Sequence, residues 1–381
     1  MKRIVTEVLK SMEDNVDVLI LTAGFGNGHL TVADALRVDI NHNYPDVRIE
    51  VIDFFELTKP KSFKKMYKKY ENLVKYGSLA FNLYYYGKEK INLLKEFDTA
   101  SYTIRQEFKK IIDCKKPKVI ISTFPVCSGY VSKYKRNNRK IPLVTIMTDI
   151  VATNEWIYPN TDLYCVATER AKSLLIKKGI NKNIIEVTGV PVRKMFYKDI
   201  EDYKIDVIKK ISPSKKVISF LGGGFGLLPN NSKLYQWFNQ LDNVHTIITT
   251  GNNKKLFKSL TKATSTYKNI SVIGYTNKIH EIMKRSDLII GKPGGITFFE
   301  AIVSNVPCII LKPKLGQEKE NCKYIKHNKM GFIANNSKEL KTIVLKVLSD
   351  NKILLDYKMR LKNFKKQTSM EPLIKKIGKW I

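Results

Sequence analysis

The chain has 381 residues, a length that exceeds one ordinary hydrophobic core and suits two domains of roughly 150 to 200 residues each. Its 67 Lys and Arg residues outnumber 35 Asp and Glu residues, and the resulting net charge of +32 favours an acidic partner surface. The N-terminus turns polar early, no stretch of about 18 apolar residues occurs, and the five cysteines form no CxxC pair. We therefore expect no signal peptide, no membrane span, and reduced thiols in a cytoplasmic protein.

Short runs rich in Val and Ile alternate with helix-periodic segments, a pattern typical of parallel sheets covered by helices on both faces. The first set of predicted strands lies at 17–24, 48–55, 118–124, 143–148, 163–168 and 184–189, and the second at 216–222, 245–251, 270–274, 287–292 and 307–312. A charged segment with a Ser-Pro-Ser turn, 193–216, separates the sets. The prediction is an α/β fold of two Rossmann-like domains with an interdomain cleft, because open parallel sheets bind ligands at the carboxyl ends of their strands.

A glycine-rich loop follows the first predicted strand of each set. The loop at 24–28 has glycine at alternate positions and leads to His29, and the second loop is 222–226. Neither fits the dinucleotide fingerprint GxGxxG, because His29 and Leu227 stand where its third glycine should, and no Walker phosphate loop exists. One such loop can be a simple turn between strand and helix. Two loops that open two halves of the chain favour a ligand other than NAD.

A third glycine segment, 289–305, runs from a predicted strand into a helix-like stretch. Pro293, Gly294 and Gly295 let the backbone approach a ligand closely, and a helix N-terminus offers unpaired N–H groups and partial positive charge, which suits a diphosphate. Thr297 can add a hydroxyl to this site. Glu300 would repel phosphate, so it suits ribose hydroxyls instead; the alternative is a solvated helix glutamate.

A loop after the last predicted strand, 312–321, carries Gln317, Glu318 and Asn321 in quick succession. Carboxamides and carboxylates at this spacing suit the many hydroxyls of a sugar. The alternative is an ordinary helix start.

The segment 59–90 combines apolar and aromatic residues at helical spacing with lysines between them, which is typical of a basic amphipathic helix at a membrane surface. The alternative is a helix docked on the first domain with its lysines in solvent. A nearby tyrosine cluster favours the lipid headgroup level. The residues assigned to the acceptor and membrane are Phe63, Lys64, Tyr67, Lys68, Tyr84 and Tyr85.

A basic chain with interleaved aromatics also fits a nucleic-acid-binding protein. However, no pattern of an RNA-recognition motif, helix-turn-helix or zinc finger occurs, and the excess charge is spread through both halves. Nucleic acid is therefore only a distant alternative partner.

Several segments, in this order, resemble one known family: "ILTAGFGNGH", "VTGVPVRKMF", "FLGGGFGL", "VIGYTNKIHEIM", "GKPGGITFFEA" and "PKLGQEKEN". The family is that of inverting glycosyltransferases of the GT-B fold, family 28, specifically the bacterial processive diacylglycerol glucosyltransferases and plant monogalactosyldiacylglycerol synthases. The resemblance covers most of the chain. It implies a first domain at 1–198, a nucleotide-sugar-binding domain at 199–365, and a C-terminal helix at about 366–381 that packs back on the first domain.

The resemblance implies that His29 is the base for the acceptor hydroxyl and that Asp149 belongs to the catalytic set. Trp156 falls on the acceptor side, where Thr153 replaces a histidine that these enzymes commonly carry. The positions implied for the donor are Gly26, Gly28, Gly223 and Gly224 beside the nucleotide, Gly274 and Tyr275 at the uracil, Pro293, Gly294, Gly295 and Thr297 at the diphosphate, Glu300 at the ribose, and Gln317 and Glu318 at the sugar.

The activity implied is transfer of a hexose, glucose from UDP-glucose, to the 3-hydroxyl of diacylglycerol with inversion to a β-glycoside, with successive additions, in glycolipid and lipoteichoic-acid anchor synthesis. Galactose as donor sugar and a polyprenyl lipid as acceptor remain open. No cofactor is implied, and no metal, since neither an HExxH nor a paired-aspartate motif occurs. The implied location is the cytoplasmic face of the membrane, as a peripheral protein of unknown oligomeric state.

Overall fold

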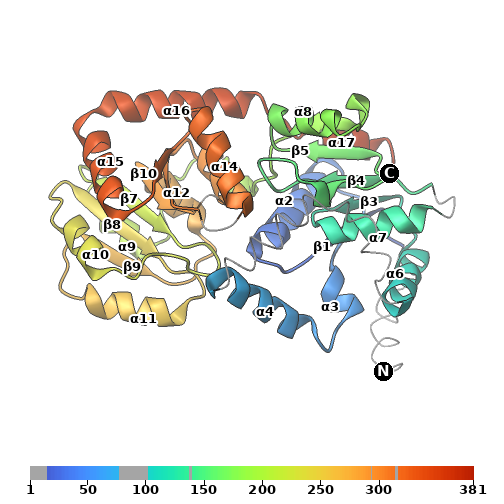
Figure 1. The fold of residues 1–381 in the computed structure, drawn as a ribbon, viewed down its shortest axis with the longest axis horizontal. Helices are drawn as coiled ribbons and strands as arrows, with labels where there is room; N and C mark the ends of the chain where they lie inside the picture. The colour runs from blue at the N-terminus through green and yellow to red at the C-terminus, as the bar shows by residue number, and fades with distance from the viewer. Residues whose placement is uncertain (1–14, 77–101, 137–139, 293, 314–315) are drawn as a thin grey trace. The chain divides into compact units, whose positions relative to one another are not determined.

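The computed structural model describes residues 15–76, 102–136, 140–292, 294–313 and 316–381, and the chain divides into two compact units (Figure 1). The first unit runs to Leu73, continues up to Arg193 and takes in the chain end from Thr368. The second unit contains Lys194–Gln367 together with the end of helix α4 (Phe63–Tyr76). The division after Arg193 lies slightly before the one expected after residue 198.

The first unit is built on a 6-stranded parallel sheet of order β2-β1-β3-β4-β5-β6. The order reverses between β1 and β3, and such a switch point is where open α/β sheets bind ligands. The strands are β1 Val18–Thr22, β2 Ile49–Asp53, β3 Val119–Ser122, β4 Leu143–Ile146, β5 Leu163–Val166 and β6 Ile185–Val187. Besides α4, the helices are α2 Asn27–Asn43, α3 Phe54–Thr58, α6 Tyr102–Lys115, α7 Pro125–Lys135, α8 Glu169–Lys177 and α17 Glu371–Gly378, with 3-10 turns η2 Asn154–Trp156 and η3 Lys182–Ile184.

The second unit has a 6-stranded parallel sheet of order β12-β11-β10-β7-β8-β9, the Rossmann order, with its switch point between β7 and β10. Its strands are β7 Lys216–Leu221, β8 Val244–Thr249, β9 Ile270–Ile273, β10 Leu288–Gly291, β11 Cys308–Leu311 and β12 Phe332–Ala334. Its helices are η4 Lys194–Phe196, α9 Asp206–Lys209, α10 Ser232–Asn239, α11 Lys254–Ala263, α12 Ile279–Arg285, α13 Gly295–Val303, α14 Gly316–His327, α15 Ser337–Ser349 and α16 Asn351–Lys366.

The chain end returns to the first unit, where α17 packs on α2. The Tyr44 hydroxyl donates to the Ile374 carbonyl at 3.3 Å, and Lys376 Nζ lies 3.0 Å from Glu186 Oε1. A β-carbon at Gly378 would meet the Tyr44 hydroxyl at 2.1 Å, so only glycine permits this approach. These contacts agree with the expected placement of the C-terminal helix.

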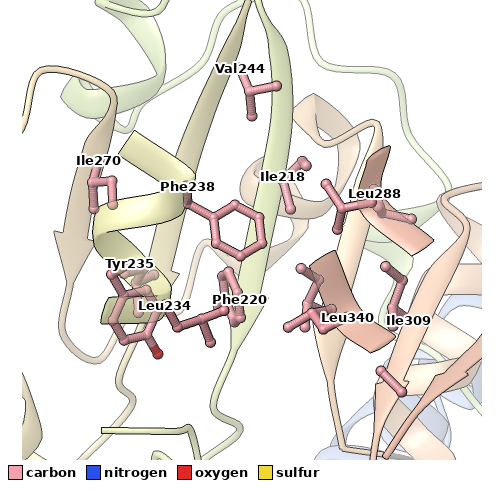
Figure 2. Packing of buried hydrophobic residues seen from close by; sticks show 14 of the residues in the cluster. Ile218, Phe220, Leu234, Tyr235, Phe238, Val244, Ile270, Leu288, Ile309 and Leu340 are labelled. Atoms are coloured by element: carbon pink, nitrogen blue, oxygen red, sulfur yellow. The ribbon is translucent and has the colours of Figure 1, made fainter. Parts of the chain in front are cut away.

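Each sheet is held by its own apolar core. In the second unit, Phe220 of β7 lies edge-on to Tyr235 and Phe238 of α10, with ring centroids 5.4 and 5.0 Å apart (Figure 2). In the first unit, β1 is buried along its whole length, as expected for a strand covered on both faces. Burial of each such Leu, Ile or Phe contributes about 1.5–3 kcal/mol, and this apolar packing fixes the position of the loops at the strand ends.

Every predicted strand forms, and the structure adds β12, a three-residue strand that the sequence interpretation missed. Across the described ranges, no helix has both the length and the apolar character needed to cross a membrane. All five cysteines are free thiols.

Candidate active site

His29 lies in the first turn of α2, directly after the loop that follows β1. The N-cap of the helix is Gly26, whose φ of 87° is a backbone conformation that favours glycine. A β-carbon at Gly26 would meet no atom within 4 Å, so backbone conformation rather than space requires this glycine. The turn that it allows aims the chain from the buried β1 to the switch point of the first sheet, where His29 stands.

The His29 ring is oriented by groups from neighbouring strands. Its Nδ1 lies 2.8 Å from the Thr123 carbonyl oxygen, which follows β3, and 3.3 Å from the Thr148 hydroxyl, which follows β4. Because a carbonyl oxygen only accepts, the contact assigns the proton to Nδ1 and leaves a lone pair on Nε2. Burial lowers the pKa of His29 to about 4 despite the bond to Thr123. The imidazole is therefore neutral at physiological pH and able to accept a proton.

Trp156 connects His29 with Asp149. The buried Trp156 ring lies 6.3 Å from the His29 ring, centroid to centroid, and its Nε1 donates to Asp149 Oδ2 at 3.3 Å. Burial raises the pKa of Asp149 to about 6, against the opposing effect of this bond. His29 and Asp149 are thus linked through the indole ring of Trp156 rather than by a direct hydrogen bond. Thr153 is buried beside them, with its hydroxyl 3.5 Å from Glu155 Oε1.

The aromatic face of α4 is docked on the first unit, which corrects the assignment of Phe63 and Tyr67 to the membrane. Both rings pack against the core of the first unit, and the Tyr67 hydroxyl donates to Asp53 Oδ1. A β-carbon at Gly24 would meet the Tyr67 ring at 2.6 Å. The docked alternative therefore describes these two residues, because both rings are partly buried against the first unit, while Lys64 and Lys68 are exposed. Tyr84 and Tyr85 lie outside the described residues.

A series of ring contacts links α4 to His29. The Phe25 ring lies 4.8 Å from Tyr67 and 5.3 Å from Phe124, with which it stacks. Phe124 in turn meets the His29 ring edge-on at 5.0 Å. The helix predicted to face lipid is thus a structural support of the loop that carries the candidate base.

The glycine loop of the second unit has backbone conformations and close contacts that require glycine. Gly223 and Gly226 adopt positive φ of 63° and 61°, and a β-carbon at Gly226 would lie 2.1 Å from the Thr250 carbonyl oxygen. The Gly224 carbonyl accepts from the Asn252 amide at 3.0 Å. The loop therefore folds tightly over the end of β7, where open space remains at Gly223 except for Lys292 Cε at 3.8 Å.

Helix α13 begins at the same switch point, after β10, and its N-cap Gly294 provides no capping side chain. By contrast, α10 and α11 are capped by Asn231 and Asn253. First-turn N–H groups that no side chain caps, together with the helix dipole, form an anion site. Gly295 and Thr297 are in this first turn, as expected, and Pro293 lies outside the described residues.

Two buried carboxylates, Glu300 of α13 and Glu318 of α14, lie in the helices that follow β10 and β11. Lys292 Nζ lies 3.5 Å from Glu318 Oε1. Lys292 was not singled out from the sequence, although a lysine between a predicted strand and a Pro-Gly-Gly turn was a usable signal. Its side chain lies between the glycine loop and α14, and its backbone stands three residues before the start of α13. The Gln317 side chain lies outside the described residues.

Gly274 and Tyr275 follow β9, the edge strand next to β8. Tyr275 is 64% exposed, and Gly274 has only the Phe257 ring near its β-carbon position, at 3.8 Å. No described contact joins this pair to Lys292 or α13, so its role at the uracil stays a prediction. Across the described ranges, no group of three or more His, Cys, Asp or Glu residues is placed to hold a metal ion.

The two Rossmann-like units, each with polar groups at its switch point, have the architecture of the GT-B class, which nucleotide-sugar glycosyltransferases and epimerases share. Two family models match: monogalactosyldiacylglycerol synthase over residues 29–192 and the glycosyltransferase family 28 C-terminal domain over residues 217–376. The protein named processive diacylglycerol beta-glucosyltransferase of Bacillus subtilis (strain 168) is 31% identical over 375 residues, covering 97% of this chain and 96% of its own. That of Staphylococcus carnosus (strain TM300) is 30% identical over 357 residues, covering 92% and 89%. The chain belongs to this family of processive diacylglycerol β-glucosyltransferases.

Solved structures share the fold at low identity. The crystal structure of the glycotransferase of kitacinnamycin has a TM-score of 0.64 at 11% identity, covering 96% of this chain and 99% of its own. The UDP complex of S. aureus MnaA has a TM-score of 0.61 at 15% identity, covering 91% of each chain. These likenesses show the two-domain architecture and carry nothing about substrates.

Proposed function

We propose that this enzyme transfers glucose from UDP-glucose to the 3-hydroxyl of diacylglycerol, inverting the anomeric centre to give a β-glycoside, and that it can extend its product by further glucose units. Family membership supports the reaction, since relatives across Bacillus and Staphylococcus carry this activity in their names. The observation that carries the proposal is the neutral His29 held at the switch point of the first sheet.

In the first unit, His29 Nε2 accepts the proton of the acceptor hydroxyl as its oxygen attacks the anomeric carbon. The Thr123 carbonyl, 2.8 Å from Nδ1, stabilises the imidazolium that forms. General-base assistance of this kind contributes a factor of about 10²–10⁴ in rate. Asp149 is not hydrogen-bonded to the ring; it orients Trp156, which lies against the ring, and is a positioning residue.

In the second unit, the α13 N-terminus binds the diphosphate, with Thr297 in its first turn. The Lys292 ammonium stabilises the negative charge that develops on the leaving UDP, and each well-placed donor of this kind contributes about 3–4 kcal/mol. Glu318 fixes Lys292 and faces the sugar hydroxyls, and Glu300 binds the ribose. The chain's own groups neutralise the leaving group, so the proposal needs no metal ion.

We place the enzyme on the cytoplasmic face of the membrane as a peripheral protein. The exposed face of α4 carries lysines at positions 64, 65, 68 and 69, and Lys61 lies exposed just before the helix. Each lysine near an anionic leaflet adds on the order of 1 kcal/mol of binding free energy. The aromatic face of the same helix is docked inward, so this contact is electrostatic.

The test is transfer of radiolabelled hexose from UDP-glucose, and separately from UDP-galactose, into chloroform-soluble product, with anionic vesicles that contain diacylglycerol. We expect label from UDP-glucose and a β-glucosyl product. Label only from UDP-galactose would show that the donor sugar is galactose and not glucose. If neither donor gives label while UDP still binds, diacylglycerol is not the acceptor, and polyprenyl lipids are the next acceptors to test.

A further inference from the structure

Helix α16 lies along the outside of the second unit (Figure 1). Its inner face is packed on the helices of the donor site: Phe364 meets Phe299 of α13 at 5.9 Å and Tyr324 of α14 at 6.5 Å between ring centroids. Tyr357 stacks on Phe332 of β12 at 4.2 Å. The inner face is packed against other elements of the unit, so only the outward face of α16 is open to a partner.

The outward face is a single continuous arc. At 100° per residue, all the exposed residues of α16 fall within about 120° of one another; they are Asn351, Lys352, Leu355, Met359, Lys362, Asn363 and Lys366. Leu355 is 64% exposed and Met359 is 57% exposed, and their i,i+4 spacing places them side by side. We call these seven residues the α16 arc.

The charge of the α16 arc is entirely positive. Lys352, Lys362 and Lys366 surround the apolar pair, and none of these ammonium groups has an ion-pair partner among the residues that the structure describes. The acidic residues nearest the arc are occupied: Asp356 forms two-oxygen contacts with Arg360 at 3.0–3.1 Å, and Asp350 caps the helix by accepting from the Lys352 amide at 2.9 Å.

Two features of the α16 arc are unfavourable in water and favourable at an anionic membrane. Lys362 and Lys366 are like charges at i,i+4 and repel one another, whereas an anionic surface would bind both. Leu355 and Met359 expose apolar surface that could enter the headgroup boundary, while the lysine stems extend and keep their ammonium groups at the phosphates. An acidic nucleic acid would satisfy the lysines only, and would leave the apolar pair without a role.

We infer that the α16 arc is a second membrane-contact surface, located on the nucleotide-sugar-binding unit and separate from the lysines of α4. The occupant is an anionic lipid bilayer, which the arc contacts with Leu355 and Met359 at the acyl boundary and with three lysines at the headgroups. The inference rests on the proposed function only in taking a membrane as the partner.

The test measures co-sedimentation of the full chain with vesicles of phosphatidylcholine containing anionic phosphatidylglycerol at about 0.15 M salt. The variants are Leu355→Ser with Met359→Ser, and Lys352→Gln with Lys362→Gln and Lys366→Gln. The matched controls are Leu345→Ser, an exposed leucine of the neighbouring α15 that is 51% exposed, and Lys254→Gln with Lys255→Gln and Lys258→Gln on α11, which removes the same charge.

We expect each arc variant to weaken vesicle partitioning at least about tenfold, with both controls close to the wild-type chain. Wild-type partitioning by the arc variants, or an equal loss in the controls, would overturn the inference. Transfer to diacylglycerol in neutral detergent micelles separates the two proposals. If that activity is present while the wild-type chain binds no vesicles, the reaction stands and the membrane surface fails; if no variant transfers sugar but the arc variants alone lose vesicle binding, the reverse holds.

Discussion

The imidazole Nδ1 of His29 lies 2.8 Å from the carbonyl oxygen of Thr123, across the switch point between β1 and β3. This contact assigns the ring proton, keeps Nε2 as an acceptor, and compensates part of the cost of burial that lowers the pKa of His29 to about 4. It joins a residue in the first turn of α2 to a residue distant in sequence, and it gives the proposed base a single orientation.

Replacing His29 by Ala should lower kcat by a factor of about 10²–10⁴, because the acceptor hydroxyl loses its base, while UDP binding stays unchanged. Kinetics with labelled UDP-glucose and calorimetry with UDP measure the two quantities. His42→Ala is the matched control, because His42 lies exposed in the same helix. A His29 variant with unaltered kcat would remove the residue from the mechanism.

The pH profile should report Asp149 rather than His29 within the physiological range. His29 stays neutral above a pKa of about 4, so activity between pH 5 and pH 8 should show one limb near pH 6, where Asp149 ionises. The Asp149→Asn variant should lose this limb and keep part of its activity. A limb that persists in this variant at the same pH would assign the titration to another group.

The stability difference between Asp149→Asn and the wild-type chain should change with pH in a definite direction. The folded-state pKa of Asp149 is raised from 3.8 to about 6, so the folded state binds the extra proton more tightly than the unfolded state does. This contribution is present below pH 3.8 and is lost as pH rises to about 6. The Tm of Asp149→Asn, relative to the wild-type chain, should therefore increase between pH 4 and pH 7, and a difference that is flat or falling with pH contradicts the burial of this carboxylate.

Lys292→Met should weaken UDP binding at least about tenfold, since it removes a charge-assisted contact to the diphosphate and the ion pair with Glu318. Lys292→Arg should retain part of the affinity, and Lys254→Met, on the exposed face of α11, should retain all of it. In a double-mutant cycle with Glu318→Gln, the two losses should not add, because the side chains are in contact. Additive losses would mean that the ion pair is unimportant in solution.

Tyr67→Phe should lower the free energy of unfolding by about 1–2 kcal/mol, because Asp53 loses a partly buried hydrogen-bond donor, and should leave vesicle binding unchanged. Lys64→Gln with Lys68→Gln should show the opposite pattern, with weaker vesicle binding at constant stability. Thermal unfolding and co-sedimentation measure both. Weaker vesicle binding in Tyr67→Phe at unchanged stability would return Tyr67 to the lipid surface.

Transfer should be insensitive to EDTA, because Lys292 and the α13 N-terminus neutralise the leaving group in the proposed reaction. The measurement is the initial rate before and after chelation, with excess Mg²⁺ added back. A loss of activity that Mg²⁺ restores would show that a divalent ion shares this role.

Secondary structure could be predicted wherever the sequence pattern that encodes it lies within a few neighbouring residues. The Val- and Ile-rich runs predicted each strand of the two sheets except β12, whose three residues are too few to show a period. The glycine loops could be located because a tight turn after a strand requires glycine: Gly26 for its positive φ alone, and Gly226 for its positive φ and for lack of space. Residue types in these segments predicted a ribose role for Glu300 and a sugar role for Glu318, and the family resemblance implied the same roles. The fold buries both carboxylates.

The sequence alone determined the fold class, the location of the glycine loops and the basic character of α4, because hydrophobic period and turn chemistry act over a few residues. Only the tertiary structure decided which face of α4 is covered, since Tyr67 meets Asp53 and Gly24 through contacts between distant segments. The same holds for the pairing of Lys292 with Glu318 and for the pKa of His29, because desolvation and ion pairing depend on neighbours that parallel strands bring together from far apart in the chain.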